Sequence, residues 1–267
     1  MSTSPDALVV GPMKAGTSWI HDYLESRGDV VLPNGVKETF FFDRRFDKGM
    51  GWYAAHFCHY DVAVHQLCIE VAPSYFHCPE APTRIRETLG DVPLIVTLRD
   101  PVKRAWSHYL HLLNRGYTRK SLREAVNDFP EILEASRYKT CLNRWQATFP
   151  SQDIHVLRLE GLTESVDDFV ADLCECLFLP YVAPADYLRG KRNAARVPAF
   201  HLIASVGIWG GNMLRSFRLY RIVNVAKRLG LKEMFFGRPG ARALPSLSDA
   251  DGQWLESQLA GEMPESV

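Results

Sequence analysis

The first stretch that could do chemistry spans residues 8–20, where an apolar segment leads into a glycine-bracketed turn and a helix-like run. Gly11 and Gly16 let the backbone approach a ligand closely, and Lys14 brings a positive charge into the turn. The backbone N–H groups of such a turn, together with the positive end of the following helix dipole, favour a phosphate or a sulfate. We therefore predict an anion-binding loop at this position.

The spacing of this loop differs from that of an ordinary nucleoside triphosphatase. Gly11 and Gly16 keep the interval of G-x-x-x-x-G-K-[ST], but Thr17 occupies the lysine position and the lysine lies inside the loop as Lys14. No obvious downstream apolar run ends in an aspartate that could hold Mg²⁺. For so short a motif, the structural alternative is a strand-to-helix turn with a solvated lysine.

A carboxylate that could act as a base stands in front of an aromatic run. Lys37 and Glu38 precede three consecutive phenylalanines at 40–42. An apolar neighbourhood raises the pKa of a carboxyl group and makes the carboxylate a better proton acceptor near neutral pH. The alternative for Glu38 is an ordinary surface acid, and three phenylalanines are usually part of a core.

A second anion-binding pair follows the apolar segment 93–98. Arg99 stands at the predicted carboxyl end of that strand, Pro101 suits the first turn of the next helix, and Ser107 lies eight residues after Arg99. A guanidinium fork and a hydroxyl are a common way to hold a terminal phosphate. The alternatives are a salt bridge of Arg99 with Asp100 and an ordinary helix serine at Ser107.

The elements that must position these residues alternate between strands and helices. We expect strands at 8–10, 63–70, 93–98 and 154–157, and helices at 17–26, 81–88, from 101 onward, at 137–149 and at 166–177, the last capped by Thr163. A short capped helix should follow Ser246 and Ser248 near the C-terminus. This alternation predicts an α/β fold with a central parallel sheet flanked by helices on both faces. Ligands of such sheets bind at the carboxyl edge.

Composition bounds the function. With 267 residues, 46% of them apolar and 23% charged, residues 1–267 are expected to form a single domain with a core at about 8–180 and a basic loop and helical portion at about 185–267. The formal net charge of zero argues against a nucleic-acid partner. Six cysteines lack zinc spacing, and no signal peptide or membrane-spanning segment is evident, so we expect reduced cysteines, no metal and a cytoplasmic location.

Four blocks together resemble those of sulfotransferases that use 3′-phosphoadenosine 5′-phosphosulfate (PAPS). They are Lys14-Ala15-Gly16-Thr17-Ser18, Lys37-Glu38 before Phe41-Phe42, Pro73-Ser74-Tyr75-Phe76, and Leu98-Arg99-Asp100-Pro101 with Arg104 and Ser107. The resemblance covers about residues 8–180 and is strongest to the heparan sulfate O- and N-sulfotransferase branch and its bacterial relatives. It implies a P-loop-like fold and transfer of a sulfuryl group from PAPS to a hydroxyl or an amine.

The resemblance also implies roles for individual residues. Lys14 would stabilise charge on the leaving phosphate oxygen, and Glu38 occupies the position of the catalytic base. The residues that would hold PAPS, or its product adenosine 3′,5′-bisphosphate (PAP), are Lys14, Ala15, Gly16, Thr17 and Ser18 at the phosphosulfate, Arg99 and Ser107 at the 3′-phosphate, and Arg192 and Arg196 in a basic loop. The acceptor would lie near Lys37, Trp52, Tyr53 and Tyr75.

One position departs from the heparan sulfate branch. In these enzymes a lysine of the E-K-[ST]-P segment helps to neutralise the sulfuryl group, whereas this chain has Val71 between Glu70 and Ala72. Loss of a preorganised donor can cost a few kcal/mol of transition-state stabilisation. Either another cation substitutes, with Lys37 the nearest in the sequence, or the enzyme is slow or catalytically degenerate.

Several alternatives remain open at this level. The loop also fits a P-loop phosphotransferase or nucleotide-binding module without sulfuryl chemistry. The acceptor is a glycan, a lipid or a small metabolite, and the oligomeric state is undetermined. The apolar and basic segment 200–231 is interpreted as a core helix with a solvated basic face, or else as a membrane-surface helix or an acceptor-binding lid.

Overall fold

Five parallel strands form the centre of the computed structural model, which describes residues 4–150, 153–190 and 244–263. The strands lie in the order β2-β3-β1-β4-β5. Their bounds are Ala7–Gly11 (β1), Val30–Val31 (β2), Leu67–Val71 (β3), Leu94–Leu98 (β4) and Ile154–Arg158 (β5). Every pairing is parallel, which confirms the predicted parallel sheet.

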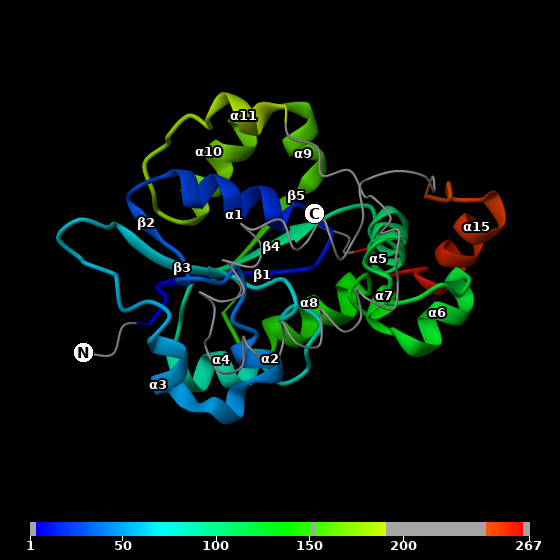
Figure 1. Cartoon of the computed structure of the whole chain (residues 1–267), viewed down its shortest axis with the longest axis horizontal. Helices are drawn as coiled ribbons and strands as arrows, with labels where there is room; N and C mark the ends of the chain where they lie inside the picture. The colour runs from blue at the N-terminus through cyan, green and yellow to red at the C-terminus, as the bar shows by residue number, and fades with distance from the viewer. Residues whose placement is uncertain (1–3, 151–152, 191–243, 264–267) are drawn as a thin grey trace.

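Helices cover both faces of this sheet, as the α/β prediction required (Figure 1). One face packs on α1 (Thr17–Ser26), α10 (Val166–Cys176) and α11 (Asp186–Arg189), with α9 (Leu159–Glu164) beside α10. The other face packs on α2 (Phe41–Arg44), α3 (Gly49–Ala54), α4 (Ala81–Leu89) and α8 (Tyr138–Gln146), and a short 3₁₀ turn, η1 (Phe46–Lys48), joins α2 to α3. Strand side chains alternate between these two cores, since successive residues of a strand point to opposite faces.

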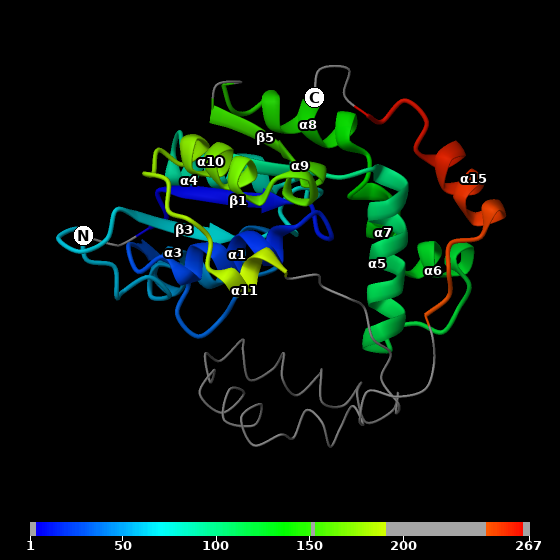
Figure 2. The same cartoon turned by 90° about the horizontal axis from the view of Figure 1, so that it is seen from above.

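A third group of helices stands beside the carboxyl end of the sheet. It contains α5 (Pro101–Arg115), α6 (Leu122–Asp128), α7 (Glu131–Glu134) and α15 (Asp249–Gln258), which share a separate apolar cluster. Figure 2 shows this group next to the arrowhead end of β1. The helix α5 therefore begins where β4 ends, at the edge of the sheet where ligands of such folds bind.

The strand order places a change of direction at the central strand. The connection after β1 leads to β2 and β3 on one side of it, whereas the chain after β3 crosses to β4 on the other side. Chain segments leaving the carboxyl ends of neighbouring strands then diverge, and a crevice opens between them. The predicted anion-binding loop follows β1 directly, so the topology puts this loop at the crevice.

Several element boundaries differ from the sequence-based expectation. The predicted strand at 63–70 begins only at Leu67, because the preceding residues form an exposed turn in which Ala63 N donates to Asp61 Oδ1 at 2.9 Å. Ser165, not Thr163, caps α10 by accepting from Asp168 N at 3.2 Å, and Thr163 lies within α9. The terminal capped helix is confirmed as α15, with Ser248 as its cap.

The cysteines and the helices of the described residues relate to two of the sequence-based expectations. All six cysteines lie among them, and each is a free thiol. Among the helices that the structure describes, none is both long enough and apolar enough to span a membrane. The basic loop with Arg192 and Arg196, and the segment 200–231, lie outside the described residues.

Candidate functional site

The loop after β1 has the backbone geometry of an anion cradle. Gly16, the N-cap of α1, has φ +91° and contributes no side-chain cap. Its carbonyl accepts from Trp19 N at 2.8 Å and from Ile20 N at 3.2 Å, which leaves the N–H groups of Thr17 and Ser18 without a partner from that residue. Lys14 also has a positive φ of 71°. A side chain at Gly11 is excluded, because a Cβ there would lie 2.4 Å from the Pro73 carbonyl oxygen. The loop is therefore built on glycines that bring two chain segments into contact.

Cations gather around the Lys14 side chain. The pKa of Lys14 is lowered to about 8, first by burial and then by the positive charges of Lys37, Arg99, Arg115 and Arg104, in that order. Such a concentration of positive charge around a half-buried amine is unfavourable unless an anion neutralises it. The electrostatics of the site therefore fit a polyanionic ligand, as the sequence predicted for this loop.

Two arginines from the β4–α5 segment donate hydrogen bonds to backbone carbonyls of the anion-binding loop. Arg99 donates from Nη1 to the carbonyl of Lys14 at 3.3 Å, and the fully buried Arg104 donates to the carbonyl of Met13 at 3.3 Å. Arg104 also donates to Ser136 Oγ and to the Ile132 carbonyl, so it connects the loop to the segment around α7. The bonds from Arg99 and Arg104 to the loop use its carbonyls and none of its N–H groups.

The two residues predicted to bind the 3′-phosphate lie just after β4 and within α5. Arg99 follows β4 directly, and Asp100 caps α5 by accepting from Lys103 N at 2.7 Å. No salt bridge between Arg99 and Asp100 is found in the described part of the chain. Ser107 lies two turns into α5 and is partly buried. Among the described residues, no hydrogen bond joins Arg99 to Ser107, and their joint role stays a prediction.

Lys37 and Glu38 approach the anion-binding loop from the segment before α2. The Nζ atom of Lys37 donates to Ser18 Oγ in the first turn of α1 at 2.8 Å, and it lies 3.7 Å from Glu38 Oε1. The structure thus brings the predicted base, a cation and the cradle together. Residues 19 positions apart in the chain form this contact.

The Glu38 carboxyl occupies an environment suited to a base. Its side chain is only 17% exposed, and burial raises its pKa above the ordinary value of 4.5. Lys37 opposes this shift, whereas the negative charges of Glu70 and Asp43 add to it. A raised pKa strengthens the carboxylate as a proton acceptor, which agrees with the prediction from the neighbouring phenylalanines.

The two tyrosines predicted to contact the acceptor lie in the interior of the protein. Tyr53 and Tyr75 are fully buried, and their hydroxyls donate to Glu70 Oε2 at 2.8 Å and 3.1 Å. Both tyrosines therefore belong to a buried network, and their predicted contact with the acceptor stays a prediction. From the sequence, Glu70 was known only as the first residue of the segment that corresponds to E-K-[ST]-P, and its hydrogen bonds with Thr39 were not predicted.

Trp52 is partly buried and packs among aromatic rings. It stacks on Phe41 at 6.2 Å between ring centroids and meets His56 edge-on at 4.5 Å. The guanidinium of Arg45 lies 5.9 Å from the Trp52 ring. Its predicted place near the acceptor stays a prediction. Val71, at the position of the missing lysine, is buried in the core beneath α1 and offers no polar atom to a ligand.

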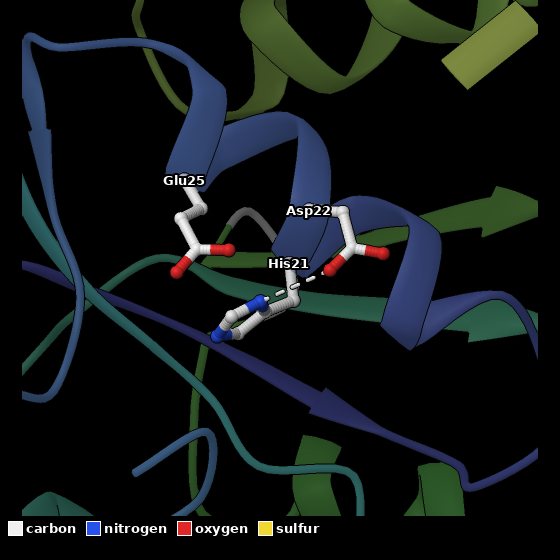
Figure 3. Close-up of side chains that lie close together, drawn as sticks. All are labelled: His21, Asp22 and Glu25. Carbon is white, nitrogen blue, oxygen red and sulfur yellow. Dashed lines mark ion pairs between the residues drawn. The ribbon is translucent and has the colours of Figure 1, made fainter. Parts of the chain in front are cut away.

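A hollow beside β5 and a cluster of side chains on α1 are two other candidate sites in the described chain, and neither resembles the anion-binding loop. A hollow beside β5, lined from α8 to α10, contains none of the predicted site residues. His21, Asp22 and Glu25 bring ligand atoms within 4.8 Å of one another, and Figure 3 shows all three side chains leaving one helix, α1. Burial and the charge of Lys37 lower the pKa of His21. Because a nearby lysine repels a cation, we assign no metal to this cluster.

Comparison with known proteins gives an independent result. A model of the sulfotransferase domain family matches residues 4–183, which include every described site residue named above. The crystal structure of a sulfotransferase from Alicyclobacillus acidocaldarius superposes with a TM-score of 0.60 at 21% identity, covering 78% of this chain and 91% of that one. At this level of identity the structural likeness supports the fold alone.

Curated relatives match part of the chain. Human heparan sulfate glucosamine 3-O-sulfotransferase 3B1 is 39% identical over 115 residues, which are 42% of this chain and 27% of the relative. Mouse heparan sulfate glucosamine 3-O-sulfotransferase 6 is 33% identical over 165 residues, 59% of this chain and 46% of the relative. The membrane-associated sulfotransferase kil1 of Dictyostelium discoideum is 32% identical over 141 residues, covering 52% and 30%. The chain thus spans less than half the length of these relatives.

Proposed function

Because the chain belongs to the sulfotransferase domain family, we propose that it transfers a sulfuryl group from PAPS to a hydroxyl of an acceptor, with a carbohydrate as the favoured class. The observation that carries this proposal is the cation cluster around Lys14, together with the Glu38 carboxyl that is joined to the cradle through Lys37 and Ser18. Cradle, cations and base are the three parts that such a transfer needs.

Each group has a defined task in this proposal. When bound, PAPS supplies the sulfuryl group and leaves as PAP. Glu38 accepts the proton of the acceptor hydroxyl, because its raised pKa makes it basic enough near neutral pH. Lys14 stabilises negative charge on the leaving phosphate oxygen, while the N-terminus of α1 binds the neighbouring oxygens. Arg99 and Ser107 hold the 3′-phosphate, which separates PAPS from simpler nucleotides.

Lys37 is proposed to replace the missing cation of the E-K-[ST]-P segment. Val71 is buried and apolar, but the Lys37 ammonium lies 2.8 Å from Ser18 Oγ, at the start of α1. From there it can neutralise the transferred group, which compensates for Val71. A catalytically degenerate protein would be expected to lack such a cation between base and cradle.

The acceptor class rests on the relatives. Two of the similar proteins are named as heparan sulfate glucosamine 3-O-sulfotransferases, and we infer a sugar hydroxyl for this chain by analogy with those names. Lipid and small-metabolite hydroxyls, and amines, are the competing classes. Transfer of radiolabelled sulfate from PAPS, screened across purified glycans, lipids and small alcohols, decides between them.

Nucleotide preference tests the proposed reaction class directly. PAP should raise the melting temperature without Mg²⁺, since a ligand at 100 times its Kd adds about 2.7 kcal/mol to the stability of the native state. ATP with Mg²⁺ should have little effect. The Lys14→Gln variant should lose the PAP response, whereas Lys139→Gln, an exposed lysine on α8, should keep it. A preference for Mg²⁺-ATP would instead identify a phosphotransferase.

A further inference from the structure

A carboxylate without a salt bridge is buried in the middle of the fold, away from solvent. Glu70, in β3, has no exposed surface, and no lysine or arginine within the described residues forms a salt bridge with it. Burying a charged group costs several kcal/mol, and an apolar side chain in this strand would pack at lower cost. Stability alone therefore does not explain a glutamate here.

Four donors converge on this carboxylate. Oε1 accepts from the backbone N–H of Thr39 at 2.8 Å and from its hydroxyl at 2.7 Å. Oε2 accepts from the hydroxyls of Tyr53 at 2.8 Å and Tyr75 at 3.1 Å. Burial raises the pKa of Glu70, and these four hydrogen bonds oppose that shift. An ionised carboxylate accepts all four bonds at once, which matches the observed arrangement.

The network ends on the residue that follows Glu38. The hydroxyls of Thr39 and Tyr75 both accept from the N–H of Phe41, at 3.1 Å and 3.0 Å, and Arg45 donates to the Thr39 carbonyl at 2.8 Å. The backbone on the C-terminal side of Glu38 is thus held at several points. On the other side of Glu38, Lys37 is tied to Ser18.

We propose that Glu70 is a positioning residue: its buried carboxylate fixes the backbone after Glu38 and thereby holds the Glu38 carboxyl beside the anion-binding loop. The inference rests on the proposed role of Glu38 as base. Glu70 acts through Thr39 and does not touch the reacting atoms. Its negative charge also acts on Glu38, because repulsion between two carboxylates disfavours ionisation and raises the pKa of Glu38.

The test is a ¹³C NMR titration of glutamate carboxyl groups, which needs neither nucleotide nor acceptor. Loss of a resonance in Glu38→Gln identifies the Glu38 signal. In Glu70→Gln, which keeps the size of the side chain and removes its charge, the Glu38 titration should move to lower pH. The control Tyr23→Phe removes a buried tyrosine hydroxyl that donates to the Val182 carbonyl at 2.8 Å under the opposite face of the sheet, and it should leave the titration unchanged.

A second variant covers the case in which Glu70→Gln does not fold. Thr39→Val keeps the backbone N–H but removes the hydroxyl that joins Glu70 to Phe41, and it should displace the Glu38 resonance while PAP affinity stays near wild type. With an identified acceptor, turnover should fall about 10–100-fold, as expected for a misplaced reacting group. A Glu38 signal and titration identical to wild type in these variants would overturn the proposal. Failure of the wild type to bind PAP would overturn the proposed function but not this coupling.

Discussion

The Lys37 ammonium donates a hydrogen bond to the Ser18 hydroxyl over 2.8 Å, in the first turn of α1. A cation at this end of a helix faces the positive end of the helix dipole, which is unfavourable in the absence of a counter-charge. Glu38, at 3.7 Å from the same ammonium, compensates only in part, because burial raises its own pKa. The anion proposed to bind between Lys37 and the cradle would supply the missing counter-charge.

Replacing Lys37 tests whether it neutralises the transferred group. We expect Lys37→Met to lower turnover with PAPS about 10²–10³-fold, the loss typical of one preorganised donor. PAP lacks the sulfuryl group, so its affinity should change much less. The measurement is steady-state sulfate transfer together with calorimetry, and the exposed Lys139→Met serves as control. If Lys37→Met transfers sulfate at the normal rate, some other cation must compensate for Val71.

Replacing Glu38 tests the base. Glu38→Gln keeps the side-chain size but cannot accept the acceptor proton, and we expect turnover to fall about 10²–10⁴-fold with PAP affinity near wild type. In the wild type, burial raises the pKa of Glu38, so the acidic limb of the kcat/KM profile should lie above pH 4.5. Glu25→Gln, an exposed carboxyl on α1, is the matched control. Near-normal turnover in Glu38→Gln, with chemistry rate-limiting, would point to another base such as His21, since Glu70 has no exposed surface.

Replacing Arg99 tests recognition of the 3′-phosphate. Arg99→Ala should weaken PAP binding by about 1.5–3 kcal/mol, the size of a hydrogen bond to a charged group. Adenosine 5′-phosphosulfate lacks the 3′-phosphate and should be nearly unaffected. Calorimetry with both ligands measures the difference, and the exposed Arg137→Ala is the control. Equal losses for both ligands would mean that Arg99 acts only through its bond to the Lys14 carbonyl.

The pH dependence of PAP binding follows from Lys14. Burial and neighbouring cations lower the pKa of Lys14 to about 8 in the free protein, and a bound anion must raise it again. Binding is therefore accompanied by proton uptake above pH 8, so PAP affinity should be constant below that pH and fall as the pH rises beyond it. Calorimetry between pH 6.5 and 9.5 checks this. In Lys14→Gln the affinity should be lower and lack this step, and a step that persists there belongs to another group.

Short-range patterns in the sequence were sufficient for the parts of the site that lie within one element. The turn after the first strand, the helix at 17–26 and Arg99 at the end of its strand follow from apolar spacing, glycine and proline, because these act over a few residues. The alternation of strands and helices likewise predicted a parallel sheet with two covered faces. Lys14 and Glu38 were recognised from their local neighbours and from the four blocks.

Only the tertiary structure decided which distant residues meet. In the sequence, Glu70 is one polar residue within a predicted buried strand. Its hydrogen bonds to Thr39, 31 positions away, form because the segment after Glu38 packs over β3. The same packing buries Tyr53 and Tyr75, which the sequence assigned to the acceptor, and brings Lys37 to Ser18. These contacts depend on strand order and helix packing, which are determined by burial and hydrogen-bond pairing between distant parts of the chain. Local residue patterns therefore do not predict them.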